Sequence, residues 1–310
     1  MPVLNKLRKY ISFMKHNVTP FRPMLLAQHS VRRALSLFGR KGMRLMDIAL
    51  TYRCNLACEH CSAACFDGCN RQELTLNDIK TLADYAVAMD FLSVNLTGGE
   101  PLIRSDIYDI VSLFNKKRIY ISIQSNMLLL TKEMARHFKI CGVNCFTTSI
   151  DSHDPREHDL FRKSPNAHSS TLKGIEIARE AGLSVLAGGV ITHQNIRSEG
   201  LEKLIRQVNE AGAIFLFNLA VPCGSWLGNK DICLTPQDRE HLQYLLDKFP
   251  LSSTDHEPGR NAKGCPAGME KIYITAYGDV IPCHFIHVAF GRIHAEPLPD
   301  IVRRMQLSSY

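Results

Sequence analysis

Residues 50–61 read LTYRCNLACEHC, which sets Cys54, Cys58 and Cys61 in a C-x3-C-x2-C spacing directly after an apolar run at residues 45–50. Thiolates bind iron–sulfur clusters, and clusters that only carry electrons take four of them, one for each iron. Three closely spaced thiolates therefore leave one iron open to chelate another molecule. A zinc knuckle or plain buried cysteines are the alternative, but zinc sites usually pair two C-x2-C units or combine one with histidines. The spacing favours a 4Fe-4S cluster with an open iron.

Short apolar runs alternate with amphipathic stretches from Arg44 onward, which is typical of repeated βα units around a parallel sheet. Strands are predicted at residues 45–50, 92–97, 120–124, 145–150, 183–191 and 214–220. Helices are predicted at residues 77–88, 106–115, 132–139, 170–181, 200–211 and 236–249. Thr75 and Asp78 form a plausible N-cap pair for the first of these helices. The fold class is therefore α/β, a partial (β/α)6 barrel with a small C-terminal hairpin extension.

Polar and glycine-containing segments follow the first four predicted strands. The cysteine loop follows the first strand, and the next three strands are followed in turn by Gly98, Gly99, Glu100 and Pro101, by Ser125 and Asn126, and by Ser149 and Asp151. Active-site groups on parallel sheets gather at the carboxyl ends of the strands, so these segments should lie together. Glycines let the backbone approach a ligand closely, and the Glu100 carboxylate can accept hydrogen bonds from an ammonium group.

These motifs together resemble those of the radical S-adenosylmethionine (SAM) superfamily, whose defining motif is C-x3-C-x2-C after the first barrel strand. Residues 50–56 look like the branch that includes pyrroloquinoline-quinone maturation, anaerobic sulfatase maturation and molybdopterin enzymes. His60 departs from the pattern, because the superfamily commonly has an aromatic residue before the third cysteine, but a histidine is still a flat ring. The resemblance covers roughly residues 45–295.

The resemblance implies a 4Fe-4S cluster on Cys54, Cys58 and Cys61, with SAM bound at the open iron. It assigns the amino group of SAM to the segment Gly98-Gly99-Glu100-Pro101. Weaker contacts to the ribose or carboxylate of SAM are implied for Ser125, Asn126, Ser149, Asp151 and Arg162. Met127 stands where relatives carry a glycine, so this loop is expected to differ in shape. Helix capping and a surface ion pair are the alternative for Asp151 and Arg162.

The implied reaction is reductive cleavage of SAM to methionine and a 5′-deoxyadenosyl radical, which takes a hydrogen atom from a substrate. The substrate is either a peptide or protein, or a small molecule that is oxidised or rearranged. An oxidoreductase-like enzyme of this kind needs a one-electron donor of the flavodoxin or ferredoxin type. A non-catalytic iron–sulfur or zinc-binding electron-transfer protein is the alternative. Glu100→Ala should separate the two, because only the enzyme should lose SAM affinity.

Cys265 and Cys283 flank a predicted hairpin that turns near Gly278, and they are expected to meet across it. The spacing Cys265-x12-Gly278-x4-Cys283 resembles the start of the SPASM and twitch extensions, which bind an auxiliary 4Fe-4S cluster. No cysteine follows Cys283. A cluster here therefore needs Cys223, Cys233 or a substrate group to complete the ligand set, unless the chain is short or the hairpin is vestigial or structural.

Eleven cysteines without a signal-peptide core favour a reducing, cytoplasmic setting over a secreted disulfide framework. The remaining cysteines, Cys65, Cys69, Cys141 and Cys145, are expected in the core or in loops. Of these, Cys65 and Cys69 lie close in sequence to the cluster loop.

The formal charge of +7 resides in a basic N-terminal arm. Residues 1–44 hold ten Lys and Arg and no acidic residue, so +7 less 10 leaves −3 for the other residues. This distribution gives no reason to expect a nucleic-acid partner for the main body. Basic amphipathic segments in the arm suit peripheral contact with a lipid surface, a cover for the open side or bottom of the barrel, or a mitochondrial transit peptide.

No apolar run approaches the ~20 residues of a membrane span. The expected organisation is an arm at residues 1–44, a radical SAM partial barrel at residues 45–250 and a truncated SPASM/twitch-like extension at residues 251–310.

Overall fold

The computed structural model describes residues 43–66, 70–223, 226–254 and 265–308. The basic arm predicted over residues 1–44 lies almost entirely outside these ranges. The structure therefore does not test whether the arm contacts a lipid surface, covers the barrel or is a transit peptide. Cys69 also lies outside the described ranges.

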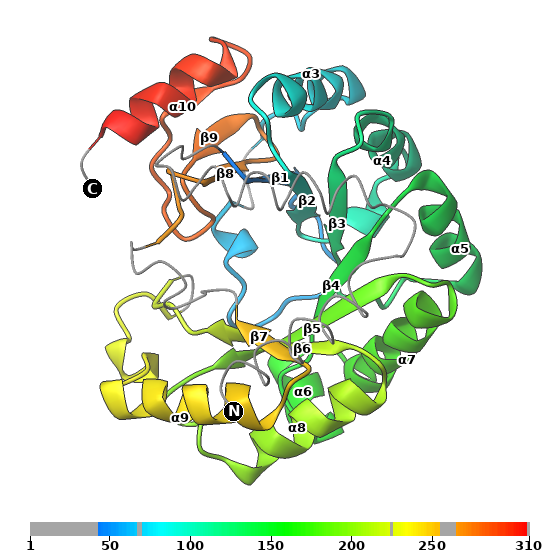
Figure 1. The fold of residues 1–310 in the computed structure, drawn as a ribbon, viewed down its shortest axis with the longest axis vertical. Helices are drawn as coiled ribbons and strands as arrows, with labels where there is room; N and C mark the ends of the chain where they lie inside the picture. Colours follow the sequence, from blue (N-terminus) through cyan, green and yellow to red (C-terminus); the bar gives the residue numbers. More distant parts are fainter. Residues whose placement is uncertain (1–42, 67–69, 224–225, 255–264, 309–310) are drawn as a thin grey trace, which may run out of the picture.

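The described residues form one sheet of ten strands in the order β10-β9-β8-β1-β2-β3-β4-β5-β6-β7. Strands β1 to β7 pair in parallel, each with the next along the chain. In Figure 1 these strands form a curved sheet with helices on its outer side. The strand bounds are β1 Leu45–Thr51, β2 Ser93–Gly98, β3 Tyr120–Gln124, β4 Cys145–Ser149, β5 Ser184–Ile191, β6 Ile214–Leu219, β7 Ser252–Thr254, β8 Lys271–Ile274, β9 Asp279–Ile281 and β10 Gly291–Arg292.

Helices connect the parallel strands and cover the outer face of the sheet. Their bounds are α3 Leu76–Ala88, α4 Ile107–Lys116, α5 Lys132–Cys141, α6 Pro155–Arg162, α7 Ala167–Glu180, α8 Glu199–Glu210, α9 Pro236–Lys248 and α10 Leu298–Leu307. The 3-10 turns are η1 Ala63–Phe66, η2 Pro101–Ile103 and η4 Lys230–Ile232. None of the helices in the described part of the chain combines the length and apolarity that crossing a bilayer would need.

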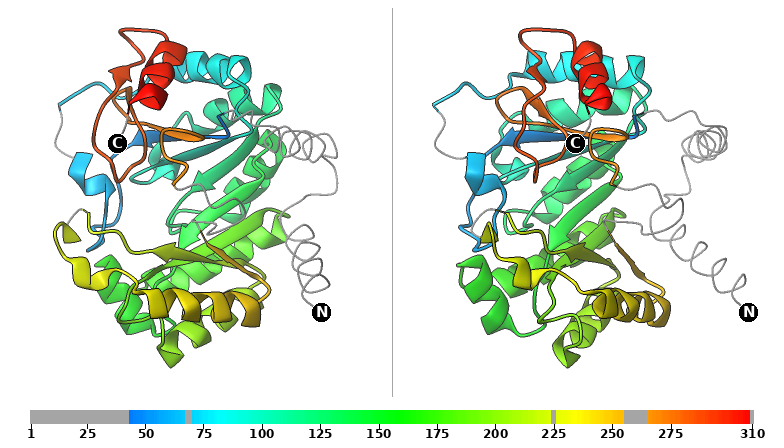
Figure 2. Two further views of the ribbon diagram at one scale, coloured as in Figure 1. Left: turned by 60° about the vertical axis from the view of Figure 1, so that its left-hand side comes forward. Right: turned by 90° about the vertical axis from the view of Figure 1, so that its left-hand side faces the viewer.

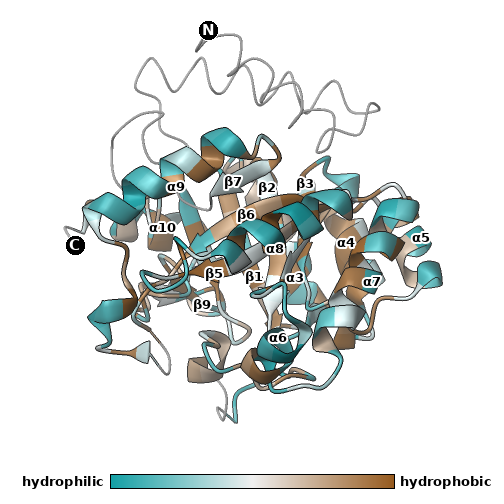
Figure 3. Ribbon diagram, turned by 90° about the horizontal axis from the view of Figure 1, so that it is seen from below, coloured by the Kyte–Doolittle hydropathy of each residue, from teal (hydrophilic) through white to brown (hydrophobic). Residues whose placement is uncertain are grey.

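Alternation along the strands separates an apolar outer face from a polar inner face. On β1, Met46, Ile48 and Leu50 are fully buried in the core, while Asp47 points the other way. Each large apolar side chain buried in this way contributes about 1.5–3 kcal/mol. Figure 3 shows the complementary pattern, in which the outward surfaces of α8 and α9 are largely hydrophilic.

The six predicted strands and six predicted helices are confirmed, each boundary within three residues of the observed one. The N-cap pair is also confirmed, because Thr75 and Asp78 form a reciprocal capping box on α3. Four elements were not predicted from the sequence: α6, β7, β10 and α10. Helix α6 buries only His158 and Arg162 and so has no apolar stripe, and β7 has only three residues. Helix α10 does carry an apolar stripe, which was missed.

The predicted C-terminal hairpin is confirmed as β8 and β9, which pair antiparallel. It joins the main sheet, because β8 pairs in parallel with the free edge of β1. Lys271 Nζ on β8 lies 2.8 Å from the Asp47 carboxylate on β1. Figure 2 shows α10 beside α3 above this hairpin, and His294 Nε2 lies 3.3 Å from Asp78 on α3. The C-terminal segment is thereby continuous with the sheet.

Candidate functional site

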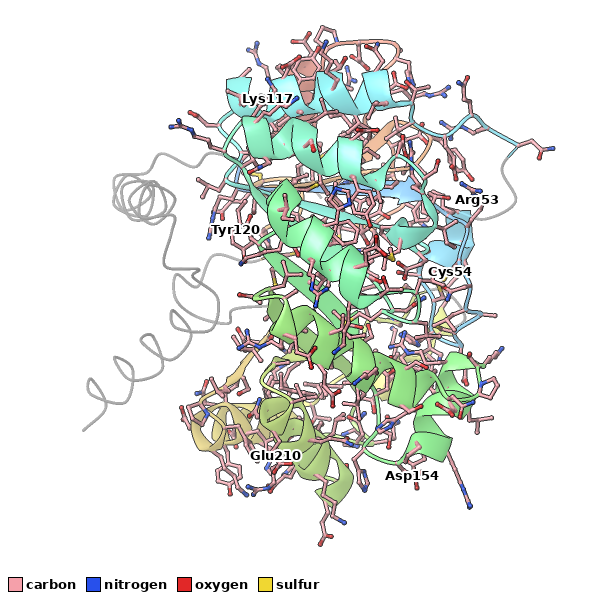
Figure 4. All side chains as sticks on the ribbon, turned by 90° about the vertical axis from the view of Figure 1, so that its right-hand side faces the viewer. Arg53, Cys54, Lys117, Tyr120, Asp154 and Glu210 are labelled. Atoms are coloured by element: carbon pink, nitrogen blue, oxygen red, sulfur yellow. The ribbon has the colours of Figure 1, made fainter. Side chains whose placement is uncertain are left out.

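The cysteine loop begins at the carboxyl end of β1. Figure 4 shows Arg53 and Cys54 on one side of the molecule and, toward the opposite side, Lys117 at the end of α4 and Tyr120 at the start of β3. Cys54 is exposed, and Cys58 and Cys61 are half-buried; all three are free thiols. Burial raises the pKa of the Cys54 thiol, and Cys58 and Cys61 raise it further. The three thiols thus belong to one loop at the carboxyl end of β1.

A cubane cluster suits this donor set. Within the described ranges, no three His, Cys, Asp or Glu side chains gather closely enough around one point to hold a single metal ion. In a 4Fe-4S cluster each thiolate binds a different iron, so the thiolates stand farther apart than around one ion. Three soft ligands from one loop fit three corners of such a cube. Binding would also release the thiol protons.

The glycines after β2 allow a close backbone crossing. Gly98 has φ +126°, in the region that favours glycine, and a Cβ there would collide with the Thr51 carbonyl oxygen. A Cβ on Gly99 would meet the carbonyl oxygen of Arg53. Gly99 N donates to Thr51 O at 2.8 Å, and Glu100 N donates to Arg53 O at 2.9 Å. The close approach predicted for these glycines is thus made to the start of the cysteine loop.

Glu100 is wholly buried and connects two loops. Its Oε1 accepts from Leu102 N at 3.0 Å, and its Oε2 accepts from Asn126 N at 2.8 Å. Burial raises the pKa of this carboxyl, against the lowering effect of those hydrogen bonds. Both oxygens are therefore engaged by the backbone. Substitution of Glu100 would disturb the loops after β2 and β3, so Glu100→Ala is not a clean test of SAM binding.

Asn126 brings the loop after β3 to the cysteine loop. Its Nδ2 donates to Asn55 Oδ1 at 2.7 Å and lies 4.0 Å from Cys54 Sγ. Ser125 is buried, and its Oγ accepts from Met127 N at 2.9 Å. Met127 has φ +65°, so its backbone takes the left-handed conformation that a glycine adopts without strain.

Asp151 and Arg162 form a buried ion pair beside the cysteine loop. Arg162 Nε donates to the Asp151 carboxylate at 2.7 Å, and Arg162 Nη2 lies 2.6 Å from it. Burial raises the pKa of Asp151, but the Arg162 guanidinium outweighs it and holds that pKa below its usual range. Arg162 Nη1 lies 3.6 Å from Cys58 Sγ. An ion pair between Asp151 and Arg162 was expected as one alternative, and it is present, but it is buried rather than on the surface. It places the Arg162 guanidinium next to the Cys58 thiol. Ser149 ends β4 at the same edge of the sheet.

Aromatic rings pack around His60. Its ring stacks on Phe161 of α6, with centroids 4.5 Å apart and planes 7° apart, and lies 6.0 Å from the Trp226 ring. Burial, helped by Arg162, lowers the pKa of His60 to about 4, so the ring is neutral at pH 7. Sequence reasoning missed Phe161, Trp226 and Asn55 as parts of this site. Asn55 stands inside the cysteine motif, and Trp226 is the single tryptophan of the chain, so weak signals existed.

Polar side chains line the inner face of the sheet. Asn95 Nδ2 on β2 donates to Asp47 Oδ1 at 3.3 Å. On the same face, Thr97 Oγ1 donates to Gln124 Oε1 at 3.2 Å, and Ser122 Oγ lies 3.4 Å from Thr147 Oγ1. This face can donate and accept hydrogen bonds.

The second cysteine pair lies near the C-terminal hairpin, as its spacing predicts. Cys265 precedes β8 and Cys283 follows β9. Burial raises the pKa of the Cys283 thiol, and Cys265 is among the neighbours that raise it further. Cys145 is buried in β4 and Cys141 is half-buried on α5, which fits the core or loop positions expected of them.

Comparison with known families gives two matches. Residues 48–208 match the model of the radical SAM superfamily. Residues 265–310 match the SPASM model, which describes an iron–sulfur cluster-binding domain. The cofactors of such chains are SAM and 4Fe-4S clusters, with an auxiliary cluster in the SPASM domain.

Individual relatives agree with these matches. The chain is 26% identical over 298 residues to an AdoMet-dependent heme synthase of Nitratidesulfovibrio vulgaris, covering 86% of this chain and 81% of the relative. It is 25% identical over 257 residues to a PqqA peptide cyclase of Granulibacter bethesdensis, covering 78% and 68%. Among solved structures, Streptococcus suis SuiB bound to its precursor peptide SuiA gives a TM-score of 0.71 at 18% identity, covering 92% of this chain and 70% of that one. The last of these shows the fold alone.

Proposed function

The chain belongs to the radical SAM superfamily, and we propose that Cys54, Cys58 and Cys61 hold the 4Fe-4S cluster at which it cleaves SAM. One observation carries the proposal. The three free thiols share one loop at the carboxyl end of β1, where Arg162 Nη1 approaches Cys58 Sγ at 3.6 Å and Asn126 Nδ2 approaches Cys54 Sγ at 4.0 Å.

When bound and reduced, a cluster with one open iron together with SAM supplies a 5′-deoxyadenosyl radical, which removes a hydrogen atom from the substrate. The chain's own residues orient the reactants and balance charge. Arg162 sets a buried positive charge beside the Cys58 thiolate, and Asp151 fixes the direction of that guanidinium through its 2.7 Å hydrogen bond. Arg162 is thus a ligand-supporting residue in this proposal.

The SAM pocket is assigned to the loops that converge on the cysteine loop. In this proposal the backbone of Gly98, Gly99 and Pro101 lines the SAM pocket. Glu100 holds the adjoining loops in place by accepting hydrogen bonds from the amides of Leu102 and Asn126. Polar groups for the ribose and carboxylate of SAM come from the ends of β3 and β4, namely Ser125, Asn126, Ser149 and Asp151, and from Arg162 at the end of α6. Residues 45–250 thereby carry SAM cleavage, and residues 251–310 carry the extension.

The substrate in this proposal is a peptide that lies against the inner face of the sheet. The amide and hydroxyl groups of Asn95, Thr97 and Gln124 can exchange hydrogen bonds with peptide groups. The peptide cyclase relative supports this choice. The heme synthase relative, which covers more of the chain, makes a tetrapyrrole the second candidate. A flavodoxin or ferredoxin supplies the electron.

The proposal is tested by giving anaerobically reconstituted full-length protein dithionite and SAM and measuring 5′-deoxyadenosine. Wild type should release it, Cys58→Ala should fall to the background rate, and Cys141→Ala should match wild type. Cluster-loaded wild type that releases no 5′-deoxyadenosine would overturn the enzyme reading in favour of a non-catalytic iron–sulfur protein.

A further inference from the structure

Cys65 lies where the cysteine loop meets the C-terminal hairpin. It belongs to η1, and the neighbouring Phe66 ring lies 4.6 Å from the His287 ring and 6.3 Å from the Tyr273 ring of β8. Tyr277 Oη donates to Phe66 O at 3.3 Å. The turn that carries Cys65 is therefore packed directly on the segments that flank Cys283.

Cys223 approaches the same turn from the connection after β6. Trp226 N donates to Cys223 O at 3.0 Å. The Trp226 ring lies 6.0 Å from the ring of His60 and 6.1 Å from that of Phe161. Residues 60–66 thus lie between the segment that carries Cys223 and the hairpin that Cys283 follows.

All four cysteines are free, and none is fully buried. Cys265 and Cys283 stand on either side of the β8–β9 hairpin, and Cys65 lies in the turn whose Phe66 ring packs on that hairpin. Cys223 lies three residues before Trp226, whose ring packs near His60. The four segments that carry these cysteines are therefore brought together by the packing around η1.

We infer that Cys65 and Cys223 join Cys265 and Cys283 as the four thiolate ligands of the auxiliary 4Fe-4S cluster. The inference rests on the proposed function and deepens it, because the SPASM match provides for such a cluster. Four thiolates, one for each iron, leave no open corner. This second cluster is therefore closed, unlike the cluster proposed for SAM.

Two other groups compete for the same places. His284 is half-buried, and its Nδ1 lies 3.8 Å from Cys283 Sγ. Cys233 follows η4, ten residues beyond Cys223. We assign the fourth place to Cys223 rather than to either of them.

The assignment places both clusters on one short piece of chain. Cys61 and Cys65 are four residues apart, so their Cα atoms are at most about 14 Å apart even if the chain were fully extended. A turn shortens this span, because Cys65 N donates to Ser62 O at 3.4 Å.

The test uses the full-length chain in a background that lacks Cys54, Cys58 and Cys61, so that its outcome is independent of SAM cleavage. After anaerobic reconstitution this parent should hold about four irons and four sulfides per chain. Cys65→Ser and Cys223→Ser should each lose iron or convert to a three-iron cluster, seen by EPR of the oxidised protein. The double variant should bind almost none.

The controls are Cys233→Ser, Cys69→Ser and His284→Ala, which should keep the iron content and the EPR spectrum of the reduced parent. Serine is close to cysteine in size, so iron loss with an unchanged far-ultraviolet circular dichroism spectrum reports a lost ligand. The assignment is overturned if the parent binds no iron, if Cys65→Ser and Cys223→Ser both keep the parent's cluster, or if a control loses it instead.

Discussion

The two cysteine groups differ in how the chain assembles them. Cys54, Cys58 and Cys61 occupy eight consecutive residues, and one buried cation, Arg162, lies beside them. The proposed auxiliary group is drawn from four separate segments, and the packing around it is aromatic. The first group is thus a local motif with a charged neighbour, whereas the cysteines of the second group come together only once the sheet has formed.

The largest loss of unfolding free energy should come from removing the buried cation, Arg162. Arg162→Ala leaves the Asp151 carboxylate buried and unpaired, which should cost about 3–5 kcal/mol of unfolding free energy. Urea denaturation of the protein before cluster loading measures this. The exposed Arg156 of the same helix provides the control, since Arg156→Ala should change stability by less than about 0.5 kcal/mol. Equal losses in the two variants would show that the ion pair is not what stabilises this loop.

Glycines in the two regions should respond differently to a methyl group. Gly98→Ala brings a Cβ against the Thr51 carbonyl oxygen, which is fixed backbone, and should cost about 3 kcal/mol. Gly268→Ala near the hairpin, at φ +74°, meets the flexible side chain of Met305 at 3.4 Å and should cost only about 1 kcal/mol. Thermal unfolding of the two variants compares them. A smaller loss for Gly98→Ala would contradict the close backbone crossing.

Two half-buried phenylalanines allow each cluster to be perturbed separately. Phe66→Ala removes the ring that packs on His287 and Tyr273, and Phe161→Ala removes the ring that stacks on His60. Each should cost about 2 kcal/mol, below the full value of a core phenylalanine. After reconstitution, Phe66→Ala should hold less of the auxiliary cluster and Phe161→Ala less of the SAM cluster. Iron per chain measures the total loss, and EPR shows which cluster is lost. Loss of the same cluster in both variants would contradict the prediction that the two rings support different clusters.

The smallest effect concerns a single hydrogen bond. Asn126→Asp replaces the Nδ2 donor, 2.7 Å from Asn55 Oδ1, with an oxygen that can only accept when ionised. Loss of this support beside Cys54 should weaken metal retention about tenfold. Timed chelation of iron measures this, with the auxiliary cluster of the same molecule as the internal control. Unchanged retention would remove Asn126 from the support of the loop.

The sequence was sufficient for the local features. Apolar runs predicted the first six strands, because that pattern depends on neighbouring residues. That Cys54, Cys58 and Cys61 hold one cluster stays a prediction from their spacing. Helix α6 was missed because its buried residues, His158 and Arg162, are polar.

The non-local features could not be predicted in the same way. From the sequence, the Glu100 carboxylate was expected to accept hydrogen bonds from the amino group of a ligand. In the structure it is wholly buried and accepts hydrogen bonds from the amides of Leu102 and Asn126. Likewise, Cys65 and Cys223 are 158 positions apart, and no spacing rule joins them. The approach of their segments depends on the packing of Trp226 against His60 and Phe161, which sequence periodicity does not encode.

The most direct test of this account is the EPR spectrum of the reduced protein recorded with and without SAM in two variants. The Cys65→Ser/Cys223→Ser variant keeps only the cluster with an open iron, so SAM should change its spectrum. The variant lacking Cys54, Cys58 and Cys61 keeps only the closed cluster, so SAM should leave its spectrum unchanged. A spectrum that responds to SAM in the second variant and not in the first would contradict the assignment of the SAM site to the cysteine loop.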